Sequence, residues 1–163
     1  MGSDSDFTIM EEASKVLEQF NISHEVLVTS AHRSPERTQK YVQGAKRRGI
    51  QIMIAGAGGA AHLAGVVASE TQLPVIGVPI NATPLNGLDS LLSTAQMPGG
   101  VPVATVSIGK SGAKNAGILA VQILALSDTK LAGQLTKYKK DQAKAVAQKS
   151  KKLKTIHVAN FKD

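Results

Sequence analysis

The sequence predicts an α/β protein built on a central parallel sheet, and three observations support this prediction. Short apolar, β-branched segments alternate with longer segments whose apolar residues recur at helical spacing. Such an alternation is typical of βαβ units with right-handed crossovers. One short segment, IQIMIAG, is apolar on both faces, as in a strand buried within a parallel sheet. No internal repeat or linker divides the 163 residues, which suits one domain with its own core.

The first part of the chain predicts a helix, a strand and a second helix. Apolar residues at helical spacing indicate the helix over 10–20. Residues 24–30 are short and β-branched, which favours a strand. The next helix, over 34–49, has clear end signals, because Ser34 is a candidate N-cap and Gly49 follows its last turn.

Three strands and two helices are expected in the middle of the chain. The strand with two apolar faces covers 50–56. A helix over 60–71 separates it from an apolar strand over 74–80. A helix over 86–96 and a strand over 101–109 follow in the same alternating order.

Two helices are predicted at the end of the chain, over 111–127 and 128–150. The helix over 111–127 is apolar nearly all round, and a helix without a polar face is buried on every side. A small sheet can cover only one of its sides, so we expect the other side to meet another subunit. The chain is therefore predicted to form a homo-oligomer.

The net charge of +7 is concentrated near the C-terminus. Residues 1–126 carry nine Lys or Arg and nine Asp or Glu, whereas 127–163 carry ten Lys and three Asp. A basic segment can bind nucleic acid or an acidic membrane, or it can be a solvated helix with a loose end. Because this segment has no Arg and only two aromatic residues, we favour the solvated helix and expect no nucleic-acid partner.

Composition excludes several classes of site and partner. There is no Cys, which excludes disulfides, thiolate metal sites and a Cys nucleophile, and suits a reducing cytoplasm. The four histidines show no i, i+4 pair and no carboxylate cluster joins them, so we expect no metal site. No apolar run approaches the length of a membrane span, so we expect no membrane partner.

Polar or Gly-rich loops follow each predicted strand, where open parallel sheets bind ligands. Two of these loops contain misleading motifs. GAGGAA (56–61) fits a dinucleotide-binding pattern, but no acid for the ribose occurs between Glu70 and Asp89. GKS (109–111) is not a P-loop, since Ala104 stands where the earlier glycine is needed.

The loop SAHRSP (30–35) carries the sharpest candidate residues. His32 can exchange protons near neutral pH, and the adjacent Arg33 can hold a phosphate or a carboxylate. Ser30 and Ser34 add hydroxyls, although the same residues would also suit an ordinary surface loop. His62 is either a second site histidine or a helix residue bonded to the backbone.

Three glycines after the strand over 50–56 have two open interpretations. Backbone N–H groups at Gly56, Gly58 and Gly59, opening a helix, favour an anion. The same glycines would also allow a helix and a strand to pack closely.

Five motifs in this order, MGSDSD, SAHRSP, AGAGGAAHLAG, GVP and MPGGVPVATVSIGK, resemble the PurE family of N5-carboxyaminoimidazole ribonucleotide mutases in purine biosynthesis. The last motif resembles the bacterial class I enzymes. The resemblance runs from Met1 to about residue 145 and fades beyond 148. It divides the chain into an α/β domain over 1–148 and a Lys-rich C-terminal tail over 149–163.

The resemblance implies a flavodoxin-like three-layer sandwich, assembled as an octamer in the cytoplasm with its sites near subunit boundaries. It implies an isomerase that needs no cofactor and moves a carboxylate from N5 to C4 of its nucleotide substrate. His32 falls on the family's catalytic histidine. The implied substrate-binding residues are Ser3, Asp6 and Arg33, completed by Ser5, Ser30, Gly56, Gly58, Gly59 and His62.

Members of this family have a β-strand just before the MGS motif, and this sequence has none before Met1. We expect the natural protein to carry several apolar, β-branched residues upstream. The structure of this chain should then show either a gap in the sheet or another segment in its place. Three other functions stay open: direct carboxylation of aminoimidazole ribonucleotide by CO2, an inactive phosphate-binding relative, and nucleic-acid binding through the Lys-rich tail.

Overall fold

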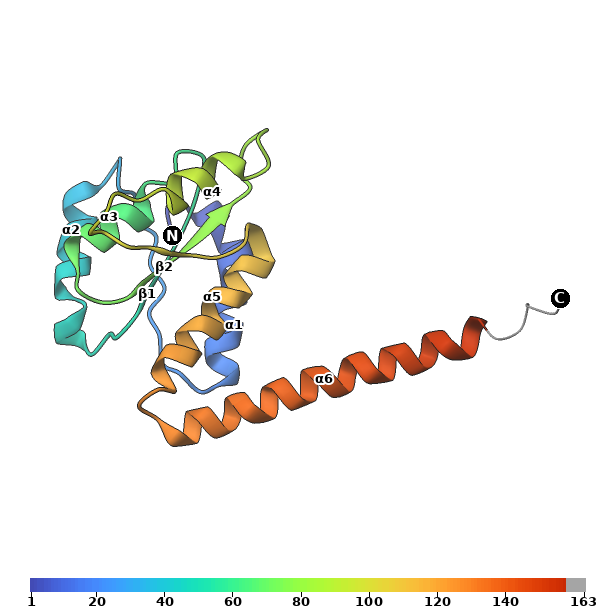
Figure 1. Cartoon of the computed structure of the whole chain (residues 1–163). Helices are drawn as coiled ribbons and strands as arrows, with labels where there is room; N and C mark the ends of the chain where they lie inside the picture. Colours follow the sequence, from blue (N-terminus) through green and yellow to red (C-terminus); the bar gives the residue numbers. More distant parts are fainter. Residues whose placement is uncertain (158–163) are drawn as a thin grey trace. The chain divides into compact units, whose positions relative to one another are not determined.

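The computed structural model describes residues 1–157, with side chains up to residue 153 (Figure 1). It contains two compact units, one over 1–123 and one that begins at Leu124. Each unit is described by itself.

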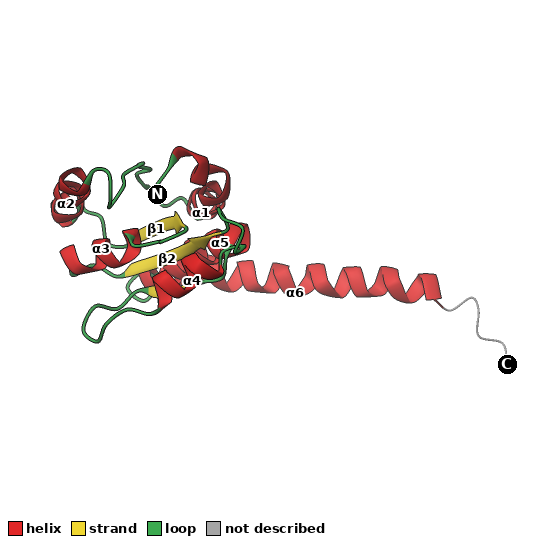
Figure 2. Cartoon of the chain, turned by 90° about the horizontal axis from the view of Figure 1, so that it is seen from above, coloured by secondary structure: helices red, strands yellow, loops and turns green. Residues whose placement is uncertain are grey.

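The first unit contains a parallel three-stranded sheet in the order β1-β2-β3. Figure 2 shows β1 and β2 side by side. β1 (Met53–Gly58) and β2 (Val75–Ile80) pair along their whole length, from Met53 opposite Val75 to Gly58 opposite Ile80. β3 (Ala104–Thr105) pairs with the middle of β2. β2 is buried at every position, as its continuous apolar sequence predicts for a central strand.

Five α-helices accompany this sheet: α1 (Phe7–Gln19), α2 (Pro35–Gly44), α3 (Leu63–Glu70), α4 (Leu88–Ala95) and α5 (Gly109–Leu124). Two 3₁₀-helices, η1 (Asp4–Asp6) and η2 (Lys46–Arg48), precede α1 and follow α2. Gly49 ends η2 with a left-handed backbone (φ 83°). This confirms Gly49 as the predicted stop signal of the helical region over 34–49.

Helices cover both faces of the sheet. A Cβ atom at Gly77 would meet Thr94 of α4 and Ala64 of α3, so these helices lie over that face. A Cβ atom at Gly56 would instead meet Met10 of α1. Because Gly77 pairs with Ala55, Gly56 points to the opposite face of the sheet. The predicted three-layer α/β sandwich with a central parallel sheet is therefore confirmed.

α5 packs against α1 on this second face (Figure 1). Gly117 makes the close approach possible, since a Cβ atom there would lie 2.8 Å from Cβ of Val16 and 3.0 Å from the carbonyl oxygen of Ala13.

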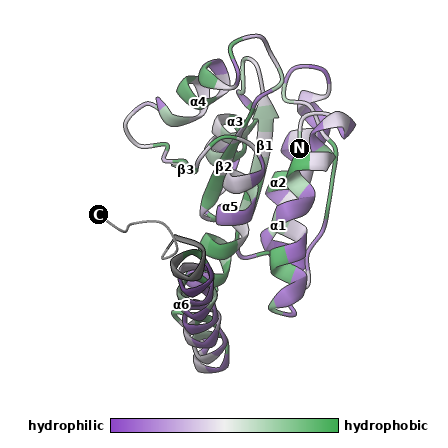
Figure 3. Cartoon of the chain, turned by 90° about the vertical axis from the view of Figure 1, so that its right-hand side faces the viewer, coloured by the Kyte–Doolittle hydropathy of each residue, from purple (hydrophilic) through white to green (hydrophobic). Residues whose placement is uncertain are grey.

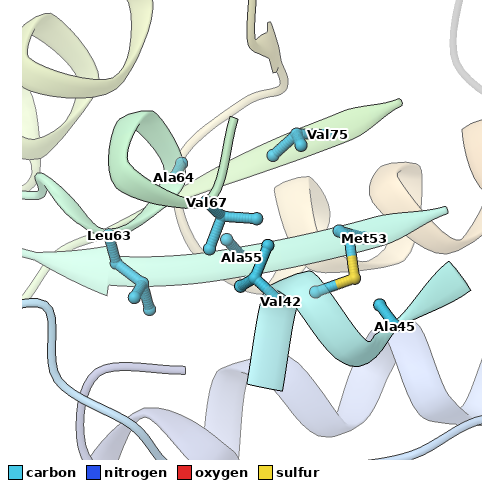
Figure 4. Close-up of a cluster of buried hydrophobic side chains, with 8 residues drawn as sticks. All are labelled: Val42, Ala45, Met53, Ala55, Leu63, Ala64, Val67 and Val75. Carbon is cyan, nitrogen blue, oxygen red and sulfur yellow. The ribbon is translucent and has the colours of Figure 1, made fainter. Parts of the chain in front are cut away.

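Aliphatic side chains fill the space between α2, α3 and the sheet (Figure 4). The central strand β2 is strongly hydrophobic (Figure 3). Burial of such side chains is the main favourable term in folding. The cluster consists of Val42, Ala45, Met53, Ala55, Leu63, Ala64, Val67 and Val75.

The predicted strand over 24–30 is wrong, because this segment forms no ladder in the structure. The Met1 ammonium donates to the Leu27 carbonyl (2.8 Å), and the Thr29 N–H donates to the Met1 carbonyl (2.9 Å). On the other side, the Gly2 N–H donates to the Gly56 carbonyl (3.1 Å). Met1 and Gly2 thus lie between the segment and β1, and along the rest of this edge no described residue pairs with β1.

The predicted strand over 101–109 is much shorter than expected, since only Ala104 and Thr105 pair with β2. The Val106 N–H still donates to the Gly77 carbonyl (3.0 Å). Two prolines and two glycines precede Ala104 closely, and proline cannot donate to a ladder.

α6 (Thr129–His157) forms most of the described part of the second unit. It extends past residue 150, where the predicted helix ends, because neither Gly nor Pro interrupts the sequence after Gly133. The predicted boundary between residues 148 and 149 lies within this helix, and residues 158–163 of the predicted tail lie outside the described residues. Most of α6 is hydrophilic (Figure 3). Within residues 1–157, no helix is both long and apolar enough to cross a membrane.

Candidate active site

A pocket of about 360 Å³ opens at the carboxyl end of β1. Three loops that are far apart in the sequence form it: the N-terminal loop, the turn before α2 and the connection from β1 to α3. Ala82 adds a residue from the loop after β2. The lining residues are Gly2, Ser3, Ser5, Asp6, Ser30, Ala31, His32, Arg33, Ala57, Gly58, Ala60, His62, Leu63 and Ala82.

Most of the predicted site residues meet at this pocket, and two do not. Gly56 lies in β1, with its Cα facing Met10 of α1, so its lack of a side chain serves helix–strand packing. Gly59 has a left-handed backbone (φ 61°), which glycine adopts without strain, but it does not line the pocket. The residues brought together are Ser3, Ser5, Asp6, Ser30, His32, Arg33, Gly58 and His62.

A capping box shapes the N-terminal loop. The Ser3 hydroxyl accepts a bond from the Ser5 N–H (3.4 Å), and the Asp6 carboxylate accepts one from the Ser3 N–H (3.0 Å). Asp6 is only 6% exposed. Burial raises the pKa of its carboxyl, although N–H groups of Ser3 and Gly2 and the Met1 ammonium favour the charged form. The Asp6 carboxylate therefore completes the capping box of η1, and it makes no side-chain hydrogen bond that caps α1.

Side-chain hydroxyls hold the turn that carries His32 and Arg33. The Ser30 hydroxyl accepts a bond from the Arg33 N–H (3.1 Å), and the Ser34 hydroxyl accepts one from the Ser30 N–H (3.1 Å). Ser34 is the N-cap residue of α2, as predicted, but its side chain makes no cap bond to that helix. Ser hydroxyls often hydrogen-bond to nearby backbone groups in turns, and these two bonds stabilise this one.

Arg33 also links the turn to the N-terminal loop. Its Nη2 donates to the Gly2 carbonyl (3.4 Å), while the rest of the side chain is exposed. A guanidinium has five N–H donors, so most of them stay available for an anion in the pocket.

His32 and His62 contact each other directly across the pocket. Nε2 of His32 lies 2.8 Å from Nδ1 of His62, and the rings are nearly perpendicular. The two histidines come from different loops, 30 residues apart in the sequence. Their spacing in sequence gives no signal for this contact, although the rule that loops after parallel strands share one edge predicts that the two loops are near.

Small apolar residues form the remaining wall of the pocket, namely Ala31, Ala57, Ala60, Leu63 and Ala82. Two of them, Ala57 and Ala60, belong to the Gly- and Ala-rich segment 56–61. Ala82 is not predicted, and its only sequence signal is its place directly after a buried strand.

The arrangement can bind an anion and move protons. Arg33, three serine hydroxyls and backbone N–H groups suit a phosphate or a carboxylate, and an imidazole can exchange protons beside it. In residues 1–157, no group of three or more His, Asp or Glu residues is placed to hold a metal ion.

Comparisons with known proteins match the whole first unit. A sequence model of the AIR carboxylase family matches residues 1–145. An N5-carboxyaminoimidazole ribonucleotide mutase of Thermotoga maritima is 53% identical over 156 residues, which cover 96% of this chain and 90% of the relative. The mutase of Bacillus subtilis is 52% identical over 153 residues, 94% of each protein.

A solved structure agrees with these sequence matches. The crystal structure of Treponema denticola PurE superposes with a TM-score of 0.83 at 27% identity, covering 94% of this chain and 95% of that one. The three-layer sandwich described above fits the flavodoxin-like fold that the resemblance implies. The match of a family model to most of the chain, with relatives above 50% identity, places it plainly: this chain belongs to the AIR carboxylase family.

Proposed function

We propose that this chain is an N5-carboxyaminoimidazole ribonucleotide mutase of purine biosynthesis, an isomerase that moves a carboxylate from N5 to C4 of one nucleotide. The observation that carries the proposal is the convergence of His32, Arg33 and the N-terminal loop on one pocket. The relatives named as mutases support it independently.

The substrate carries a phosphate and a carboxylate, and the pocket offers complementary groups. Arg33 and the hydroxyls of Ser3, Ser5 and Ser30 bind the anionic groups, and the Asp6 carboxylate accepts bonds from ribose hydroxyls. Gly58 and His62 complete the binding surface. Gly56 lets Met10 of α1 pack against β1, and Gly59 supplies a left-handed backbone in the connection from β1 to α3.

The reaction needs one proton carrier. As the N5–carboxylate bond breaks and CO2 leaves, protonated His32 gives a proton to N5. The retained CO2 then forms a bond with C4, and neutral His32 takes the proton that C4 releases. The proton given in the first step equals the proton taken in the last, so His32 returns to its initial state without another reactant.

The apolar wall suits the intermediate state. Free CO2 must stay in the pocket until C4 captures it, and CO2 is a small molecule without charge. Ala57, Ala60 and Ala82 offer it a surface without competing hydrogen bonds.

Direct carboxylation of aminoimidazole ribonucleotide is the second candidate, since the same pocket would serve. The two reactions differ in the source of the carbon. We expect purified protein to convert N5-carboxyaminoimidazole ribonucleotide in an absorbance assay without added bicarbonate. Conversion of aminoimidazole ribonucleotide alone, and only with bicarbonate, would identify the carboxylase instead, and no conversion of either would indicate the inactive relative.

The chain acts as a homo-oligomer, and the resemblance to the family implies an octamer. It works in the cytoplasm. Ile118, Leu119 and Ile123 of α5 are only half-buried within the chain, which leaves apolar surface for another subunit. The absence of Cys and the biosynthetic role of the relatives support the compartment.

A further inference from the structure

The hydrogen bond between His32 and His62 joins a residue of the turn before α2 to the residue that begins α3. His62 is the N-cap residue of α3: its N–H donates to Ala60 (2.8 Å), and its carbonyl accepts from the N–H of Val66 (3.0 Å). The next residue, Leu63, is buried in the core. The backbone of His62 is therefore held at the start of α3, directly before a core residue. His32 lies in the turn before α2, and the side chains of both histidines are exposed.

Both imidazoles are otherwise unbonded within the described part of the chain. No other protein group there hydrogen-bonds to either ring, so this is the one hydrogen bond among the described residues that orients the His32 ring. It uses Nε2 of His32 and leaves Nδ1 as the only ring nitrogen that can serve a substrate.

The chemistry of the proton carrier decides which ring donates. Protonated His32 carries hydrogen on both nitrogens, so its Nε2 can only donate and Nδ1 of His62 must accept. After His32 gives up the proton on Nδ1, its Nε2 keeps its hydrogen and the bond persists. In the reverse arrangement, His62 donates to a bare Nε2. His32 could then never be protonated while the bond lasts, and a neutral ring is a poor acid.

We propose that His62 is a positioning residue for His32: it accepts the Nε2 hydrogen, holds the ring in one orientation and reserves Nδ1 for the proton that moves between N5 and C4. This inference rests on the proposed function and assigns to His62 a task beyond substrate contact. The logic is that of an orienting acceptor behind a catalytic histidine, with a neutral imidazole in place of a carboxylate.

The first test needs no variant. In protein labelled with nitrogen-15 histidine, neutral His32 should carry its hydrogen on Nε2 and show a bare Nδ1, and so should His62. Chemical shifts of ring nitrogens separate these tautomers. A His32 ring with its hydrogen on Nδ1 would overturn the inference.

The second test removes the acceptor. His62→Phe keeps an aromatic ring but cannot accept the bond, whereas His62→Asn keeps an acceptor near the position of Nδ1. We expect His62→Phe to lower kcat by about 10²-fold, the cost of a misplaced catalytic group, with KM changed much less. His62→Asn should recover most of this loss. His24→Phe is the matched control, because His24 is an exposed histidine whose ring hydrogen-bonds to the Ile22 carbonyl, and it lies outside the pocket.

The spectroscopic readout separates positioning from a general loss of structure. In His62→Phe, the nitrogen-15 signals of His32 should change from one tautomer to a mixture, while in His24→Phe they should stay as in the parent. If His62→Phe kept both the His32 tautomer and kcat, the inference would fail although the proposed function would stand. If the parent protein itself did not convert N5-carboxyaminoimidazole ribonucleotide, the proposed function would fail first.

Discussion

At the scale of single residues, His32 and Arg33 are neighbours in the chain but make different contacts in the pocket. His32 contacts a second imidazole, whereas Arg33 contacts the Gly2 carbonyl and keeps most of its donors available. The sequence predicts both residues, because a histidine beside an arginine is a chemical signal in itself, although the strand predicted before them does not form. It does not predict the partner of either, because such contacts depend on how separate loops meet in space.

His32→Asn should abolish turnover while leaving substrate binding measurable. An amide keeps the approximate shape and a hydrogen-bonding group but cannot carry the proton. General acid–base catalysis contributes about 10²–10⁴-fold, and one residue that serves both steps could contribute more. Calorimetric titration with substrate and a steady-state assay would measure the two effects. Near-native rates would show that His32 is not the proton carrier.

Arg33→Ala should mainly weaken substrate affinity. The change removes a partner for an anion and no proton carrier, so KM should rise while kcat changes little. Arg37→Ala is a suitable control, because Arg37 is exposed on α2 and does not line the pocket. Unchanged affinity together with a collapsed kcat would instead assign Arg33 a catalytic role.

At the scale of elements, prediction succeeded where a segment carries its own start and stop signals. The predicted helix over 34–49 has Ser34 as its N-cap and Gly49 after its last turn, and the structure places α2 and η2 between these two residues. The segment 24–30 has a strand-like sequence but lacks a ladder partner beyond Met1, so Val26 and Val28 stay exposed. A strand is stabilised by the strands beside it, and the sequence of one segment does not show whether such a strand is present.

Close helix packing on the second face of the sheet depends on Gly117. Gly117→Ala should lower the thermal unfolding midpoint, since the new Cβ atom would crowd Cβ of Val16 and the Ala13 carbonyl. Overpacking of this kind costs about 1–3 kcal/mol, which outweighs the gain of up to about 1 kcal/mol from replacing Gly in a helix.

Gly133→Ala provides the matched control for that substitution. Gly133 also lies within a helix, but a Cβ atom there would meet nothing within 4 Å. We expect this change to be neutral or slightly stabilising. Equal effects of the two changes on the unfolding midpoint would show that α1 and α5 are less closely packed than described.

At the scale of the whole molecule, the parallel sheet determines where the site forms. The topology predicts that the loops after β1 and β2 lie at the carboxyl edge of the sheet. The N-terminal loop and the turn before α2 meet them there, although neither follows a described strand. The role of Gly56 could not be predicted in the same way, because a glycine beside a ligand and a glycine beneath a helix look alike in sequence. Only the position of Met10 distinguishes them.

The apolar surface of α5 predicts the state of assembly. Light scattering at working concentration should report a homo-oligomer, with an octamer expected, because half-buried Ile118 and Leu119 need a second covering layer. A particle of 17.0 kDa, the mass of one chain, would contradict this prediction.

The transfer of carbon within one substrate molecule tests the central claim most directly. N5-carboxyaminoimidazole ribonucleotide labelled with carbon-13 in its carboxylate would be turned over in buffer that contains unlabelled bicarbonate, and the product followed by NMR. We predict that the label appears in the C4 carboxylate in most product molecules, because CO2 stays in the pocket between release and capture. Product that carries only unlabelled carbon would show that CO2 comes from solution and would contradict the mutase mechanism.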